Sequence, residues 1–313
     1  MKTIVAASPG EMCNPDPRKA GARSPHVIIS PDSDTDLQAV HAWLLSQPIV
    51  DQLRAAVDDA IRYVLDGART WRFDLTSAKV DSDERSSVGT KLQYHVIEQL
   101  GLVKQPPLDT AILGVAVEIK GTVRKTWMIP REGQCEITLM IQIDAPSHRF
   151  RALLMRTHRA WLTGKKGNRD LKRSPQAQAV RDYALEVTPW IDLPLEPLRL
   201  LTFDQLAVVF GPEGQTKRLT ALFGYLPEIV IPRSSIETVG ATNKDPMRRA
   251  RQAKPNVLNE HGLVVLVGKW QPERAIAAEL GHDLSNAAWV AVPAAKMVAL
   301  GYDPTAFLNT NEA

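Results

Sequence analysis

The fold is decided by the stretch Asp109-Thr-Ala-Ile-Leu-Gly-Val-Ala-Val-Glu-Ile-Lys120. From Ile112 to Lys120 the apolar residues follow the two-residue period of a β-strand. Glu118 and Lys120 are two residues apart, so both side chains leave the same face of that strand. Asp109 stands at the strand's entry, behind Pro106-Pro107, where a bend would place its carboxylate beside that of Glu118.

These side chains suit Mg²⁺ chemistry on a phosphodiester. Two converging carboxylates supply the hard oxygen ligands that Mg²⁺ prefers, and a lysine on the same face can activate a water and offset phosphate charge. An acid, about ten residues and then acid-x-Lys is the pattern of the PD-(D/E)xK nucleases. An edge-strand salt bridge that points to solvent is the alternative interpretation. The second acid-x-Lys triplet, Asp170-Leu171-Lys172, lies in a polar stretch and is set aside.

The first half of the chain predicts an α+β domain. Residues 1–35 are rich in Pro, Ser, Asp and Gly and are expected to form a mobile tail. Apolar spacing predicts three helices, over 36–44, over 53–64, and around Leu92, Val96 and Leu100 with an end at Gly101. Four strands in a meander are then expected at 112–120, 124–129, 136–143 and 150–155.

The second half predicts a mainly helical domain. Residues 163–174 are polar and basic and form the predicted linker. Helices are expected near 176–185 and at 203–210, 217–226, 233–239 and 245–254, with strands at 262–268 and 289–293. A short helix, a turn, a second basic helix and a strand follow one another in a winged helix-turn-helix. The predicted division is a tail (1–35), an α+β domain (36–162), a linker (163–174) and a winged-helix domain (175–313).

Composition excludes several classes of protein. The 313 residues are 44% hydrophobic and 23% charged, which is typical of a globular protein. No apolar run is long enough for a membrane span or a secretion signal. Cys13 and Cys135 are too few for a disulfide framework or a tetrahedral zinc site, the histidines are scattered, and a reducing cytoplasm is expected. The stretch 211–217 breaks the Walker spacing, so no nucleotide cofactor is expected.

Basic residues are concentrated in two stretches. Residues 151–181 contain nine Lys or Arg against one acid, and residues 217–254 contain eight against three, although the net charge is only +3. Two basic surfaces predict a polyanion such as double-stranded DNA, and solvated faces are the alternative. The expected DNA-binding residues are Lys165, Lys166, Arg169, Lys172, Arg173, Arg233, Lys244, Arg248, Arg249 and Arg251. Among them, the three arginines behind the Asp245-Pro246 helix start best suit base or phosphate contacts.

Several motifs together resemble the NaeI family of type II restriction endonucleases, from about residue 36 to residue 293. The matching stretches are Leu65-Asp-Gly67, Arg69-Thr70, Gly89-Thr90, Asp109 with Gly114-Val-Ala-Val-Glu-Ile-Lys120, Trp127-Met-Ile-Pro130, Asn168-Arg-Asp-Leu-Lys-Arg173 and Gly262 to Gly268. The stretches 127–130 and 168–173 are the most distinctive, because generic nuclease chemistry does not require them.

The resemblance implies an N-terminal endonuclease domain of the PD-(D/E)xK type and a C-terminal winged-helix domain. It implies a cytoplasmic bacterial homodimer that uses Mg²⁺ and binds two copies of a GC-rich palindrome, one cut and one acting as effector. Asp109, Glu118 and Lys120 take the metal and water positions of the catalytic site. Where the family motif reads Gly-Thr-x-x-Glu, this chain has Gln93, which replaces a carboxylate by a neutral amide.

Two other functions remain open at this point. In the first, the chain is a DNA-binding regulator that does not cleave, and Gln93 is the residue that favours it. In the second, the chain is a nicking or mismatch-repair nuclease of the same fold. Incubation of plasmid with Mg²⁺ or EDTA separates the three, since only a restriction endonuclease gives Mg²⁺-dependent linear product.

Overall fold

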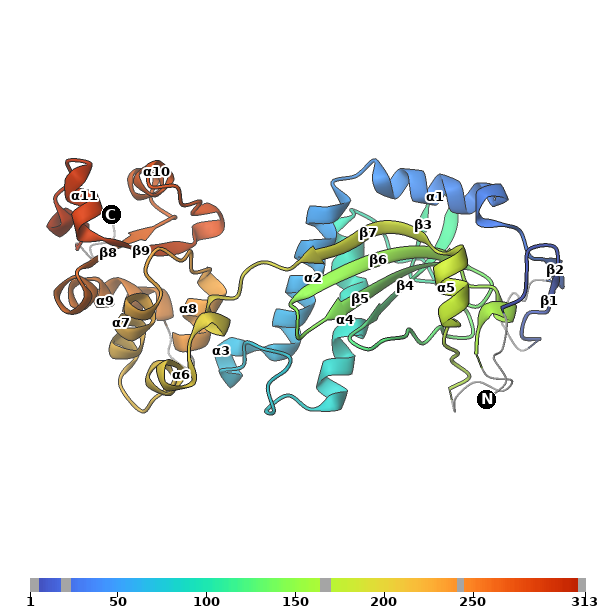
Figure 1. Ribbon diagram of the computed structural model, residues 1–313, viewed down its shortest axis with the longest axis horizontal. Coiled ribbons are helices and arrows are strands. Elements are labelled where there is room, and N and C mark those ends of the chain that lie inside the picture. The colour runs from blue at the N-terminus through green and yellow to red at the C-terminus, as the bar shows by residue number, and fades with distance from the viewer. Residues whose placement is uncertain (1–5, 18–23, 164–169, 241–244, 309–313) are drawn as a thin grey trace. The chain divides into compact units, whose positions relative to one another are not determined.

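The computed structural model describes residues 6–17, 24–163, 170–240 and 245–308 (Figure 1). The chain divides into two compact units. Unit 1 comprises residues 1–64 and 80–194, and unit 2 comprises residues 65–79 and 195–313. The division therefore falls after Pro194 rather than in the predicted linker at 163–174, and one early segment belongs with the second half.

Unit 1 is built on a five-stranded mixed sheet in the order β3-β4-β5-β6-β7. The strands are β3 (Thr110–Ile112), β4 (Val115–Thr122), β5 (Ile137–Asp144), β6 (Arg149–Arg156) and β7 (Leu185–Asp192). β4 and β5 are parallel, whereas the other neighbours are antiparallel. The predicted α+β class is confirmed, but the predicted meander is wrong.

The parallel pair explains why one predicted strand is absent. Parallel neighbours need a crossover connection, and residues 124–129 lie in the connection between β4 and β5. Trp127 and Ile129 are buried there, and Ile129 forms an isolated bridge with Arg173 instead of joining the sheet. β7 was not predicted, because Pro189 interrupts the alternation of apolar and polar residues that indicates a strand. Proline is tolerated on an edge strand, which β7 is.

Four α-helices in the described part of unit 1 flank the strands of this sheet in the sequence order of the chain. They are α1 (Thr35–Leu45), α2 (Ile49–Leu65), α4 (Ser82–Gln99) and the short α5 (Ala177–Tyr183). α1 packs against β6 and β7, and α4 packs against β4. α4 begins at a capping box in which Asp81 accepts from the amide of Glu84 and Glu84 returns the contact. The three helices predicted from apolar spacing are confirmed.

The first described residues pack on the sheet, although they were expected to be a mobile tail. β1 (Met12–Cys13) and β2 (His26–Val27) form a small antiparallel pair, with Cys13 opposite His26. Ala6, Cys13 and Ile28 are buried in a cluster with side chains of β5, β6 and α5. Local composition could not show this, because the partners of these residues lie more than a hundred positions away.

Unit 2 is mainly helical. Its helices are α3 (Gly67–Thr70), α6 (Phe203–Val209), α7 (Gln215–Tyr225), α8 (Arg233–Gly240), α9 (Pro246–His261), α10 (Gln271–Glu279) and α11 (Ala294–Ala299). β8 (Leu263–Val267) and β9 (Trp289–Pro293) form an antiparallel pair. Among the described residues, no helix has the length and apolarity needed to cross a bilayer.

A buried ion pair joins α9 and α10 inside unit 2. Lys254 is 1% exposed, and its Nζ lies 3.2 Å from Glu273 Oε1. Glu273 also accepts from the Val267 amide at 2.6 Å, and Lys254 donates to the Phe307 carbonyl at 3.2 Å. Burial lowers the pKa of Lys254 and raises that of Glu273, because each charged form loses its hydration. Loss of either partner would leave the other charge buried without compensation.

Replacing Lys254 alone is therefore expected to destabilise unit 2 strongly. Lys254→Met leaves the Glu273 carboxylate buried without its counter-charge, which should reduce the free energy of unfolding by about 3–5 kcal/mol. The double variant Lys254→Met/Glu273→Gln should recover most of this loss, since the amide oxygen still accepts from Val267. Urea unfolding measures both. The matched control is Lys217→Met, which breaks an exposed pair with Glu213 and should cost less than about 1 kcal/mol.

Candidate active site

The two predicted acids come from neighbouring segments of the sheet, with Glu118 in the middle of β4. Asp109 immediately precedes β3, and Oδ2 of its carboxylate accepts a hydrogen bond from the Ile119 amide at 2.9 Å. This bond ties Asp109 to the strand position next to Glu118. Asp109 is 6% exposed and Glu118 is 3% exposed, so both carboxylates are withdrawn from solvent. The chain bend between them and the preceding helix contains a cis Pro106–Pro107 peptide bond.

Lys120 pairs with Glu118 on the same face of β4, as the two-residue spacing predicts. Lys120 Nζ lies 2.6 Å from Glu118 Oε1. Burial is the main reason that the pKa of Glu118 is raised, and the nearby charge of Asp109 raises it further. The Lys120 ammonium opposes this shift. A carboxyl with a raised pKa in a dry site gains from any additional positive charge that reaches it.

Close contact between α4 and β4 fixes the wall of the site. A Cβ added at Gly89 would collide with the Gly121 carbonyl oxygen, and one added at Gly121 would lie 3.0 Å from the Gly89 Cα. Only two glycines allow the helix and the strand to approach this closely. Gly121 directly follows Lys120, so the contact sets the distance between the lysine and the residues of α4.

A cavity of about 520 Å³ opens beside this contact. Ser86, Thr90 and Gln93 line it from α4, and Lys120 lines it from β4. Arg124 and Lys172 add two further cations to the lining. The predicted residues Gln93 and Lys120 therefore face one space, and so does Lys172, which follows them by more than fifty positions. Three cations that line one cavity suit a phosphate group, and the pair between Lys120 and Glu118 connects the buried acids to this cavity.

Three contributors to the site were not expected from the sequence. Arg124 lies on the segment after β4 that was predicted to be a strand. Gly133 packs against Glu118, since a Cβ at this position would lie 3.1 Å from Glu118 Cγ. Lys104 Nζ lies 3.8 Å from Asp109 Oδ1. The sequence alone could have indicated only Lys104, because it is a cation five residues before a candidate acid. Arg124 and Gly133 reach the site through long-range packing.

The expected DNA-binding residues do not form one group. Lys165, Lys166, Arg169 and Lys244 lie outside the described residues. Lys172 lines the cavity, whereas the Arg173 backbone bonds to Ile129 and its side chain is buried. Arg233 pairs with Glu237 at 2.7 Å.

The three arginines of α9 are divided between its two faces. Arg248 and Arg249 are exposed, and Arg249 donates to Gln252 at 2.8 Å. Arg251 is buried among the residues that surround Lys254, so its place on the helix turns it away from solvent. Of the three, only Arg248 and Arg249 are exposed for contact with a partner.

Comparison with known proteins gives the class of enzyme. The family model described as restriction endonuclease NaeI matches residues 38–310, and the chain is a type II deoxyribonuclease. It belongs to the NaeI restriction endonuclease family. A comparison with curated protein sequences returned no match. Restriction endonucleases generally use a divalent metal ion, and the carboxylate oxygens of Asp109 and Glu118 are ligands that fit one.

Substitution of Gly89 should separate α4 from β4. The Cβ of Gly89→Ala meets a backbone carbonyl that no side-chain rotation can clear, so we expect a loss of about 1–3 kcal/mol in the free energy of unfolding. DNA cleavage should fall by more than this loss of folded protein explains, because Lys120 shifts relative to α4. Gly214→Ala is the control, since nothing lies within 4 Å of its Cβ position. Equal behaviour of the two variants would contradict the assigned contact.

Proposed function

We propose that the chain is a Mg²⁺-dependent, sequence-specific endonuclease that uses Asp109, Glu118 and Lys120 to hydrolyse a phosphodiester bond in double-stranded DNA. The observation that carries this proposal is the buried acid pair in which Lys120 Nζ lies 2.6 Å from Glu118 Oε1, since Lys120 also lines a cavity together with Arg124 and Lys172. An edge-strand salt bridge, the alternative interpretation, does not account for an acid pair withdrawn from solvent.

Each side chain has a role that its contacts support. Asp109 and Glu118 would hold Mg²⁺, which when bound polarises a phosphoryl oxygen and makes a bound water more acidic. The backbone bond from Ile119 orients Asp109 for this task. Lys120 contacts Glu118 and also faces the cavity, so its ammonium can orient the attacking water and stabilise the negative charge that develops on the phosphate.

We further propose that unit 2 is a winged-helix module that contacts DNA. α8, α9 and the β8–β9 pair follow the order of that motif, and Arg248 and Arg249 project from the first turns of α9. By resemblance to the family, a homodimer would bind two copies of a GC-rich palindrome, one cut and one acting as effector. Cleavage rates on plasmids with one and with two recognition sites test the effector role.

A family member that binds DNA without cutting it is the first alternative against which this proposal is tested. Gln93 favours it, because this side chain lines the cavity where the family has a carboxylate. A nicking or mismatch-repair nuclease is the second. Plasmid treated with the protein and Mg²⁺ should become linear, whereas a regulator leaves it supercoiled and a nicking enzyme gives open circles. EDTA should abolish the linear product.

Lys120→Ala is expected to abolish cleavage while DNA binding stays within about tenfold of wild type. The ammonium that assists the water and the phosphate is lost, but the other cations of the protein remain. Plasmid cleavage and a gel-shift titration in Ca²⁺ or without metal measure the two properties. Lys125→Ala, which removes an exposed lysine five positions along, is the control and should cut normally. Near wild-type cleavage by Lys120→Ala would remove this residue from the site.

Gln93→Glu is expected to lower the Mg²⁺ concentration at half-maximal cleavage. An amide oxygen can accept from a metal-bound water but brings no charge, whereas a glutamate adds attraction to the cation. Repulsion from Asp109 and Glu118 opposes this gain in the metal-free enzyme, and we expect the attraction to be larger at millimolar Mg²⁺. Gln99→Glu adds the same charge to α4 away from the cavity and is the control. An unchanged or raised midpoint means that Gln93 does not serve the metal.

A further inference from the structure

A second cluster of side chains converges where β1 and β2 meet the ends of β5 and β6. Cys13, His26, Cys135 and His158 place one potential ligand atom each within 4.8 Å of all the others. Both cysteines and His158 are buried, and His26 is half-buried. The pairs that touch are 122 and 132 positions apart in the chain. Asp109 and Glu118 contribute nothing to this cluster.

Two distances within the cluster are close to the edges of a tetrahedron around a zinc ion. Cys13 Sγ and Cys135 Sγ are 3.6 Å apart, and His26 Nε2 and His158 Nδ1 are 3.1 Å apart. With Zn–S bonds of about 2.3 Å and Zn–N bonds of about 2.0 Å, a tetrahedral ion separates two sulfurs by about 3.8 Å and two nitrogens by about 3.3 Å. Two thiolates and two imidazoles are also the soft and borderline ligands that select zinc over magnesium.

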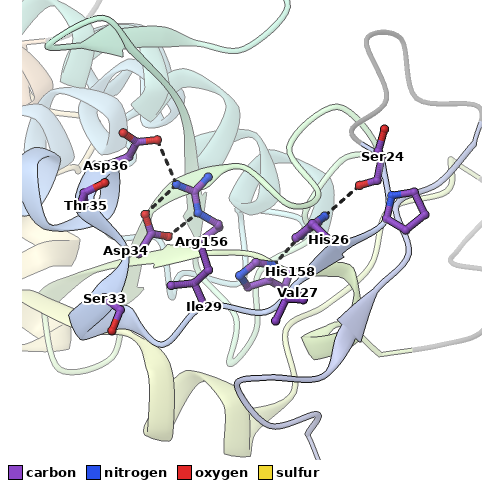
Figure 2. Close-up of a pocket in the computed structure, with 11 residues that line it drawn as sticks. Ser24, His26, Val27, Ile29, Ser33, Asp34, Thr35, Asp36, Arg156 and His158 are labelled. Atoms are coloured by element: carbon purple, nitrogen blue, oxygen red, sulfur yellow. Dashed lines mark hydrogen bonds and ion pairs between the residues drawn. The ribbon is translucent and has the colours of Figure 1, made fainter.

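Contacts around the cluster orient these ligand atoms. His26 Nδ1 lies 3.2 Å from the Ser24 carbonyl oxygen, which fixes the proton on Nδ1 and leaves the Nε2 lone pair directed at His158 (Figure 2). The Arg159 amide donates to Cys135 Sγ at 3.4 Å, the type of contact that stabilises a thiolate ligand. The His158 ring stands perpendicular to Trp161, with 4.6 Å between the ring centroids, so its orientation is also restricted.

The backbone brings the four ligands together from two directions. Cys13 and His26 are directly opposite each other in the β1–β2 pair. Cys135 precedes β5 in a left-handed conformation with a φ of 67°, and its amide donates to Thr157, next to His158. Beside the cluster, Arg156 donates to Asp34 at 2.9 Å and lies 3.6 Å from Asp36 (Figure 2). The segment before α1 is thus anchored to the end of β6 at adjacent points.

We propose that Cys13, His26, Cys135 and His158 bind one structural Zn²⁺ ion that fastens the N-terminal segment to the ends of β5 and β6. Four protein ligands close the coordination sphere, so this ion has no open position for catalysis. A β-pair with two residues in each strand is too short to persist by itself, and the ion supplies the missing stability. The expectation that two cysteines are too few for a zinc site overlooked the two distant histidines.

A disulfide between Cys13 and Cys135 is the competing explanation for their proximity. It would need no histidine, whereas both imidazoles direct a nitrogen at the cluster. The two explanations also differ in what they do to the thiols. If the cysteines bind zinc, a thiol reagent should label two thiols per chain after denaturation in a chelator. If they form a disulfide, the reagent should label neither cysteine until a reductant is added.

The test begins with the metal content of the full-length protein, purified without chelators or metal-affinity resin. Plasma mass spectrometry should find about one zinc per chain, and Cys13→Ser or His158→Ala should lower this below about a tenth of an equivalent. Lys120→Ala and His95→Gln are the controls and should keep their zinc. Replacement of zinc by Co²⁺ in the wild-type protein should give the visible absorption of tetrahedral Co²⁺ with thiolate ligands, and this readout needs no variant to fold.

Limited proteolysis then tests the structural role. Removal of zinc by a strong chelator should expose the chain before α1 to cleavage at least about tenfold faster, while the remainder of unit 1 stays protected. The proposal fails if the protein contains no zinc and binds no Co²⁺ in tetrahedral form. It also fails if Cys13 and Cys135 form a disulfide, or if the ligand variants retain the metal. Loss of plasmid cleavage in Lys120→Ala with full zinc content would show that the two sites are independent.

Discussion

Burial of two carboxylates is the constraint on which the arrangement of unit 1 depends. The charge of Asp109 raises the pKa of Glu118, and both carboxylates are withdrawn from the water that would screen them. The Ile119 amide and the Lys120 ammonium offset part of this cost. A bound cation would offset the remainder, so these electrostatics support the metal site that we propose.

The sequence predicted those contacts of the candidate site that depend on local structure. Glu118 and Lys120 share a face because side chains alternate along a strand. Asp109 is brought to the strand by a chain bend close to it in sequence. Lys172 and Arg124 reach the cavity through a crossover between parallel strands, and nothing in their own neighbourhood indicates it. The same limit explains the false strand at 124–129 and the missed β7. In unit 2 the apolar spacing is again a local signal, and α6, α7, α8, β8 and β9 were predicted to within about two residues. The helix predicted at 245–254 was too short, because α9 continues past Pro255 to His261.

The parallel pair β4–β5 also relates the acid pair to the N-terminal cluster. Lys120 is in register with Met140, and paired residues on neighbouring strands point to the same side of a sheet. Met140 belongs to the core that contains Cys13, Cys135 and Trp161. The opposite side of β4 carries Ile119 and Gly121, against which α4 packs. Glu118 and Lys120 therefore lie on the side of the sheet that carries this core, and a shift of register by one residue would exchange them with Ile119 and Gly121.

The early segment of unit 2 has a consequence for how the chain is made. Residues 65–79 contribute Phe73, which stacks on Phe210 with 5.8 Å between the ring centroids, and Trp71, over which Arg218 lies at 5.0 Å. On the ribosome this segment emerges long before α6 and α7 exist. At roughly 5–20 residues per second its apolar side chains wait many seconds for their partners. During that time unit 1 has to fold from two segments of the chain that residues 65–79 separate. Neither unit is therefore encoded by one continuous piece of the gene.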